Sequence, residues 1–212
     1  MNRNSAWRHS LGSCLVVIGL GVLGSTVTGE AVAGCSMYTG PTTMPPSWKA
    51  AMAKSNGNDK GGGDRSYASI VGMWRVTLVS DGTAYPATIP NGVIVDFGTA
   101  QWHSDGTEIL ISGGRAPSTG DVCMGVWEQT GPATYKLKHI GLSYVSSDTP
   151  PPLGPVSPAA FVGPAIIRET ITLNRARNSF EGTFTIDQYG ADETTLLQHI
   201  GGTVTATRFT MD

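Results

Sequence analysis

The chain has 212 residues, of which 40% are hydrophobic and 14% are charged, and its formal net charge is −2 at pH 7. This length fits one domain with additional terminal segments. Nucleic-acid binding relies on clustered Lys and Arg side chains that neutralise phosphates, so the charge excludes a strong polyanion-binding function. The 28 glycines and 13 prolines favour short strands joined by turns over a helical fold.

Residues 1–33 have the three parts of a secretory signal peptide. Arg3 and Arg8 form a basic start, Leu11–Leu23 is an apolar run, and Ala31-Val32-Ala33 is an A-x-A cleavage site. The alternative is a transmembrane anchor, but a spanning helix needs roughly 20 apolar residues and this run is shorter. We therefore expect export, to the periplasm or the medium. Cleavage before Gly34 removes two arginines and one glutamate, which changes the formal charge from −2 to −3.

Cys35 has two predicted fates. The segment Val32-Ala33-Gly34-Cys35 resembles a bacterial lipoprotein box, which would anchor the protein to a membrane through Cys35, although Glu30 and a polar stretch separate this box from the apolar run. In an oxidising compartment Cys35 can instead pair with Cys123. Such a bond would contribute on the order of 4 kcal/mol by the loop-entropy argument. We expect the disulfide, with two unpaired thiols as the alternative.

The remaining chain divides into a tether and a strand-rich domain. Residues 34–67 contain scattered prolines and the run SNGNDKGGG, which predicts a flexible tether, and residues 68–212 form the domain. Short apolar stretches separated by Gly, Asn, Asp and Pro predict about eight strands. In chain order these are Ile70–Ser80, Val93–His103, Glu108–Ser112, Val122–Gln129, Thr134–Val145, Ala165–Leu173, Ser179–Asp187 and Thr194–Thr210. An eight-stranded meander predicts an all-β, antiparallel up-and-down β-barrel.

Two long connections interrupt this pattern of short turns. They are Gly113–Asp121 and the apolar, proline-rich Thr149–Pro164. Long loops in compact domains are often binding loops or lids. Packing on the outer wall of the barrel is the equal alternative.

Gly72-Met73-Trp74 opens the first strand, and Arg208 lies in the last. This combination resembles the calycin or lipocalin pattern, in which a Gly-x-Trp in the first strand accompanies a basic residue late in the chain. The resemblance implies that Arg208 packs over the Trp74 indole and closes one end of the barrel, a cation–π contact of roughly 0.5–2 kcal/mol. Both residues would then be structural.

Four further segments resemble a group of uncharacterised secreted bacterial proteins. They are GMWRVTLVSDG, QWHSDGTEI, VCMGVWEQTGPATYKLKHIG and FEGTFTIDQYG, and with the chain between them they cover nearly all of residues 69–210. This resemblance implies the domain and its export and implies no chemistry.

Alternation along the strands predicts which polar side chains enter the barrel. Lys136 and Lys138 must face outward, so His139, two residues from Leu137, should face inward. Glu169 shares the face of Ile167 and Ile171 and should also point inward. The same reasoning takes His103 inward through its parity with Val93, Val95 and Phe97.

A buried His–Glu pair in a pocket is a candidate general base, and a satisfied core network is the more ordinary interpretation. On the first interpretation His139 and Glu169 would be catalytic, and His103, Tyr135 and Trp127 would contact a ligand. No metal-ligand spacing, G-x-S-x-G elbow or phosphate-binding loop occurs, so the sequence predicts neither a metal nor another cofactor.

These observations support three functions. The first is an exported calycin-like protein that binds a small, largely apolar molecule in its barrel, because eight-stranded barrels can enclose one such ligand. The second is a cofactor-independent isomerase, cyclase or lyase that uses His139 and Glu169. The third is a structural surface protein with a filled barrel.

Overall fold

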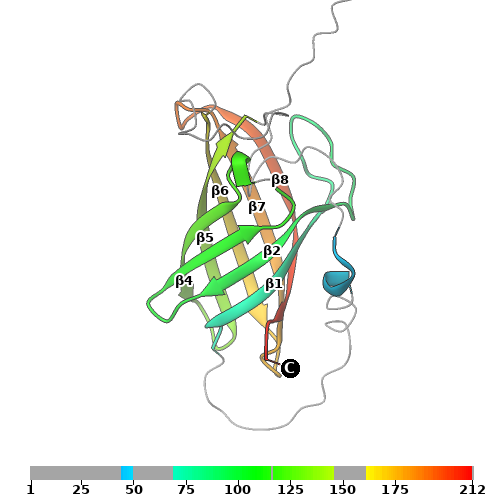
Figure 1. The fold of residues 1–212 in the computed structure, drawn as a ribbon, viewed down its shortest axis with the longest axis vertical. Helices are drawn as coiled ribbons and strands as arrows, with labels where there is room; N and C mark the ends of the chain where they lie inside the picture. The colour runs from blue at the N-terminus through cyan, green and yellow to red at the C-terminus, as the bar shows by residue number, and fades with distance from the viewer. Residues whose placement is uncertain (1–43, 50–68, 116, 146–160, 212) are drawn as a thin grey trace, which may run out of the picture.

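The computed structural model describes residues 44–49, 69–115, 117–145 and 161–211 (Figure 1). Their regular structure is almost entirely β, as the alternation in the sequence predicts. The strands are β1 (Gly72–Ser80), β2 (Ile94–Trp102), β3 (Thr107–Ser112), β4 (Val122–Gln129), β5 (Thr134–Tyr144), β6 (Phe161–Leu173), β7 (Ser179–Tyr189) and β8 (Leu196–Arg208). A 3-10 turn, η1 (Pro117–Thr119), lies between β3 and β4.

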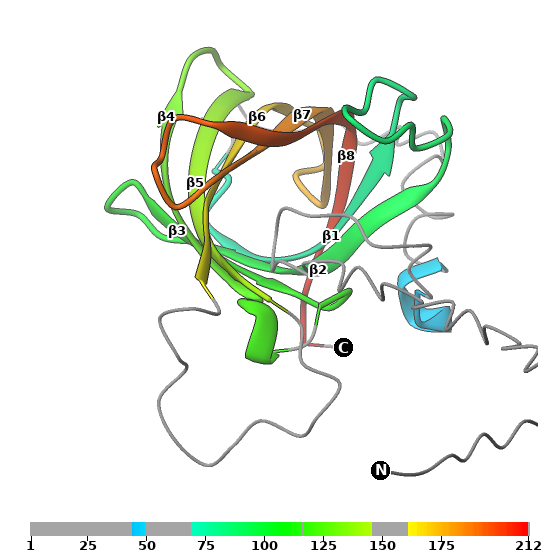
Figure 2. The ribbon, with the colours of Figure 1, turned by 90° about the horizontal axis from the view of Figure 1, so that it is seen from above.

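The eight strands form one closed antiparallel barrel. Each strand pairs with the next along the chain, and β1 pairs with β8 to close the ring (Figure 2). Closure leaves no free sheet edge, so every strand pairs on both sides. The predicted up-and-down barrel is confirmed, and its architecture is consistent with a calycin-like fold. Within the described residues no helix is long and apolar enough to span a membrane.

The inward and outward faces follow strict alternation in β5. Tyr135, Leu137 and His139 are buried, whereas Lys136 and Lys138 are exposed. Successive side chains of a strand point to opposite faces, so the charged residues set the phase of the whole strand. The sequence-based assignment of these faces is confirmed.

One end of the barrel is closed by the contact that the calycin resemblance implies. The Arg208 guanidinium lies 4.1 Å from the centroid of the buried Trp74 ring. Its three nitrogens donate to the carbonyl oxygens of Arg177, Val71 and Ser69 at 2.8–2.9 Å. Gly72 has a φ of 134°, and a Cβ at this position would lie 2.6 Å from the Arg208 Nη1. The glycine therefore leaves room for the guanidinium.

Aromatic side chains fill the barrel interior next to this contact. The Trp102 ring lies 5.7 Å from that of Trp127, 6.3 Å from that of Tyr135 and 6.1 Å from that of Phe180, and Phe180 packs on Trp74 at 5.0 Å. Tilted and edge-to-face pairs at these separations stabilise a core beyond the area that they bury. This end of the barrel is therefore a packed core.

The inward assignment of His103 is wrong. The buried, inward-facing residues of β2 are Asp96, Gly98, Ala100 and Trp102, whereas Gln101 is exposed and His103 lies beyond the strand, partly exposed, at the start of the hairpin turn. The prediction took its parity from Val93, Val95 and Phe97 and assumed that no bulge intervenes. Asp96 is opposite Leu78 but Ile94 is opposite Val79, so Val95 lies in a bulge and belongs to the core, and the parity changes before Phe97. Phe97 faces outward and is buried for another reason. Its ring packs at 6.0 Å against Trp48 of the short helical turn at residues 46–49, on the outside of the barrel.

Two other expectations concern the loops and the termini. β6 begins at Phe161, so the strand includes the last residues of the expected loop Thr149–Pro164. The expected signal peptide at 1–33, the tether before Met44 and the site at Cys35 lie outside the described residues. Cys123 is fully buried and disulfide-bonded. Its pairing with Cys35 stays a prediction.

Candidate functional site

His139 and Glu169 both point into the barrel, as predicted from strand parity. Their side chains are 1% and 5% exposed, and the His139 Nε2 lies 3.9 Å from the Glu169 Oε1. They are not directly opposed, because His139 pairs with Ile167 and Glu169 with Leu137. The two side chains therefore meet along the diagonal between neighbouring strands.

A third member, Glu108, was not identified from the sequence. Its Oε2 lies 3.2 Å from the His139 Nδ1, and its side chain is fully buried. Glu108 on β3 is opposite Gly125 on β4, and Gly125 is opposite His139 on β5. Adjacent strands lie about 4.8 Å apart, so Glu108 reaches His139 across an entire intervening strand.

Gly125 makes this reach across β4 sterically feasible. A Cβ at position 125 would lie 3.0 Å from the Glu108 Oε2 and 3.1 Å from the Leu137 Cδ1. Both contacts are tighter than ordinary van der Waals distances, so a larger residue would displace the carboxyl group or the leucine. We call Glu108, His139 and Glu169 together the interior cluster.

Burial dominates the protonation of the interior cluster. It raises the pKa of Glu108 to about 9, with the nearby Glu169 adding to the rise, and it raises the pKa of Glu169 to about 8. It lowers the pKa of His139 to about 3. A charge is costly in a low-dielectric interior, so each group favours its neutral form. At pH 7 the cluster therefore consists of two carboxylic acids and a neutral imidazole.

The polar atoms of the cluster have short contacts without hydrogen-bond geometry. Neither nitrogen of His139 and neither carboxyl oxygen of Glu108 forms a hydrogen bond with any part of the chain that the structure describes. The Nε1 of Trp102, whose residue is opposite Glu108 on β2, also lacks a hydrogen bond. Buried polar groups are almost always satisfied, and each exception calls for an explanation.

Other buried polar side chains of the interior show what a satisfied group looks like. Asp96 accepts hydrogen bonds from the Ser112 hydroxyl and from two backbone N–H groups, at 2.8–3.2 Å. Gln188 contacts the Ser143 hydroxyl at 2.6 Å and donates to three carbonyl oxygens. These residues hold the loops and strand ends in place, whereas the side chains of Glu108 and His139 have no such bonds.

The other three residues predicted to contact a ligand, Tyr135, Trp127 and His103, lie in two different environments. Tyr135 is buried among the aromatic side chains, with its ring 5.8 Å from that of Trp127. The Trp127 Nε1 donates to the carbonyl oxygens of His103 and Thr107. The His103 Nδ1 lies 3.1 Å from the Thr107 hydroxyl in the same hairpin. Trp127, on β4, therefore packs against the β2–β3 turn that contains His103.

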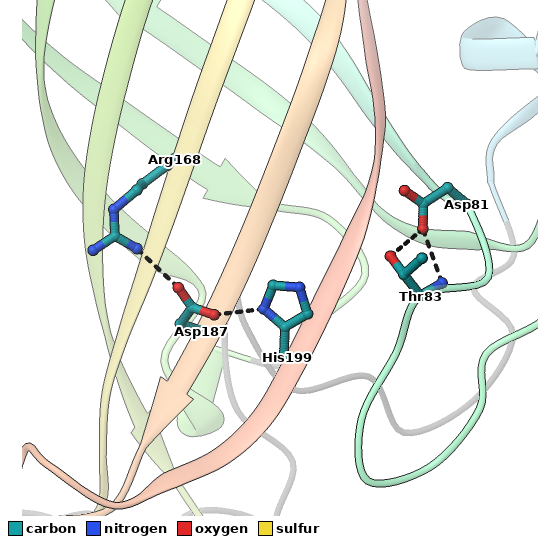
Figure 3. Close-up of polar contacts among 5 residues, drawn as sticks. All are labelled: Asp81, Thr83, Arg168, Asp187 and His199. Atoms are coloured by element: carbon teal, nitrogen blue, oxygen red, sulfur yellow. Dashed lines mark hydrogen bonds and ion pairs between the residues drawn. The ribbon is translucent and has the colours of Figure 1, made fainter.

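A second polar cluster lies on the outer wall. One carboxylate oxygen of Asp187, on β7, accepts a hydrogen bond from the Arg168 Nη1 at 2.8 Å. The other oxygen lies 2.6 Å from the His199 Nδ1 (Figure 3). Asp81 accepts two hydrogen bonds from Thr83 in the loop after β1, also drawn in Figure 3. These contacts join neighbouring strands on the outer wall and brace one loop.

Within the described ranges, no three His, Cys, Asp or Glu side chains are grouped so that they could hold a metal ion. No protein-family model matches the chain. The search of curated proteins likewise found no significant match. The functional argument therefore depends on the barrel and its interior cluster.

Proposed function

We propose that this chain is an exported calycin-like binding protein whose barrel takes up a small, largely apolar molecule with one polar group. The supporting observation is the interior cluster, where buried atoms of Glu108 and His139 lack hydrogen bonds. A ligand hydroxyl could accept from a protonated carboxyl group and donate to, or accept from, the imidazole, whereas a ligand carbonyl could accept from either group. The indole of Trp102, opposite Glu108 on β2, would contact its apolar part, since most small-molecule sites are lined by apolar and aromatic side chains.

The export part of the proposal rests on the sequence of residues 1–33. The mature protein would begin at Gly34, or at a lipidated Cys35 on the alternative route. N-terminal sequencing and intact mass measurement of protein exported by its own host distinguish the two. An exported chain that retains Met1 would refute the signal peptide.

Ligand binding is tested by native mass spectrometry of the protein purified from its own host, followed by identification of any released molecule. We expect a bound mass in the wild type and its loss in His139→Gln, with the barrel intact by circular dichroism. Glu181→Gln, an exposed change on β7, is the matched control. If no mass is retained and His139→Gln alters only the free energy of unfolding, the third interpretation, a filled structural barrel, is correct.

An isomerase, cyclase or lyase is the second candidate, because the cluster places a proton acceptor beside proton donors. Neutral His139 can take a proton from a substrate carbon while the Glu169 carboxylic acid gives one to another substrate atom. Incubation of the released molecule with protein in D₂O tests this step. Deuterium incorporation at carbon with the wild type and not with His139→Gln supports an enzyme, and no incorporation leaves the binding protein.

A further inference from the structure

The outer wall of β3–β6 carries an apolar surface that the proposed function does not use. One cross-strand row consists of directly opposed residues, and a second row runs beside it. The first row is Ile109, Met124, Ile140 and Ile166, and the second includes Ile111, Val122 and Leu142. Ile109 and Ile166 are partly buried and the other named residues are exposed. Contiguous exposed apolar side chains commonly mark an interaction site.

Two adjoining hollows follow this surface. One, of about 490 Å³, is bordered by outward-facing residues of the first row together with Val126 and Lys138. The other, of about 470 Å³, is bordered by Lys136, Arg168, Glu128, Thr170 and again by Val126 and Lys138. Both volumes lie within the range of small-molecule sites. The apolar hollow therefore leads directly into a charged one, with Lys138 at the junction.

The charges at this junction are unbalanced. Arg168 is paired with Asp187, and Lys136 is opposite Glu128 on β4. Lys138 is opposite Val126 on one side and Arg168 on the other, and it has no ion pair within the described residues. Like charges directly opposed in a sheet are unfavourable, so an anion beside Lys138 would be stabilised.

We propose that this face binds an anionic amphiphile, with its acyl or alkyl chain along the row from Ile109 to Ile166 and its anionic group at Lys138. Four strands span about 14 Å, which accommodates a medium-length chain lying across them. The side chains of the first row and of Lys138 alternate with the inward-facing side chains of the same strands, so they lie on the opposite face of the sheet from the interior cluster.

The test uses isothermal titration calorimetry of the full mature protein with decanoate and with uncharged decanol. Lys138→Met should weaken decanoate binding by about three- to tenfold and leave decanol binding unchanged. Met124→Glu should weaken both by about tenfold or more. Met73→Glu on β1 and Lys49→Met, both exposed residues elsewhere on the molecule, are the matched controls and should change neither.

Three outcomes would overturn the proposal. Decanoate that fails to bind at millimolar concentration excludes the amphiphile. Equal binding by the wild type and Met124→Glu locates the ligand elsewhere, including the barrel interior. A dimer in sedimentation velocity that Met124→Glu dissociates would show instead that a second copy of the chain covers this face.

Discussion

The interior cluster should make the domain most stable in mildly acidic solution. The two carboxyl groups have pKa values of about 9 and 8 in the folded protein against 4.5 as model groups, and His139 has about 3 against 6.5. Between pH 4.5 and 6.5 the folded cluster holds two protons, whereas the unfolded groups hold one, on the histidine. Between pH 6.5 and 8 the folded cluster still holds two and the unfolded groups hold none.

Stability falls with rising pH wherever the folded state binds more protons. The free energy of unfolding should therefore fall by up to about 1.4 kcal/mol per pH unit from pH 5 to 6, and by up to about 2.7 from pH 7 to 8. Below pH 4.5 the unfolded chain holds the extra proton on His139, so stability should rise from pH 3 to 4.5. The slopes are upper limits, because an ionised carboxylate beside His139 would recover part of the energy by ion pairing.

Glu108→Gln removes one of the retained protons and thereby isolates the effect. In this variant the remaining cluster should contribute a slope of about zero between pH 5 and 6, and about half the wild-type slope between pH 7 and 8. Urea unfolding at each pH, followed by tryptophan fluorescence, measures both slopes. Exposed Glu181→Gln should leave the wild-type profile unchanged. Equal slopes in Glu108→Gln and the wild type would refute neutral carboxyl groups and indicate an ionised cluster.

Two substitutions and one peptide map test other features of the domain. Trp74→Ala should cost about 3–5 kcal/mol in urea unfolding, through lost core volume, and a cost below 1 kcal/mol would contradict its role beneath Arg208. Gly125→Ala should cost about 1–3 kcal/mol, because the new methyl group meets the cluster carboxyl; an unchanged midpoint would show that this carboxyl group moves away freely. Peptide mapping without reduction should recover Cys35 joined to Cys123, and a free thiol or a diacylglyceryl group on Cys35 would disprove that pairing.

The strands were predictable because charged residues and turns mark them in the sequence. Lys136 and Lys138 determine the phase of β5, and Asp105-Gly106 marks the turn between β2 and β3. Consecutive pairing of the strands then follows from the short connections. His139 and Glu169 could be assigned to the interior on this basis alone.

Glu108 could not be assigned in the same way, because both faces of β3 are apolar. Ile109 and Ile111 occupy the outer face, and Leu110 shares the inner face with Glu108. A carboxylate on such a strand is normally placed in solvent. Its contact with His139 also depends on the register of two strand pairs, which alternation does not specify. His103 shows the converse error. Phe97 was assigned to the inner face because it is apolar, but it faces outward and is covered by Trp48, which lies outside the barrel strands.

Gly-x-Trp occurs twice in the domain, as Gly72-Met73-Trp74 and as Gly125-Val126-Trp127, and the glycine has the same steric use in both. Each glycine faces inward and leaves space for a polar side chain from another strand, Arg208 in the first case and Glu108 in the second. The two sites differ in what happens to that side chain. The guanidinium donates to three carbonyl oxygens, as expected of a residue with a structural role. The carboxyl group at the second site is buried beside His139 without a hydrogen bond. If stability were the sole constraint, apolar residues in place of the cluster would serve as well or better. The proposed barrel ligand explains why the cluster is present, because its polar group would complete the missing hydrogen bonds.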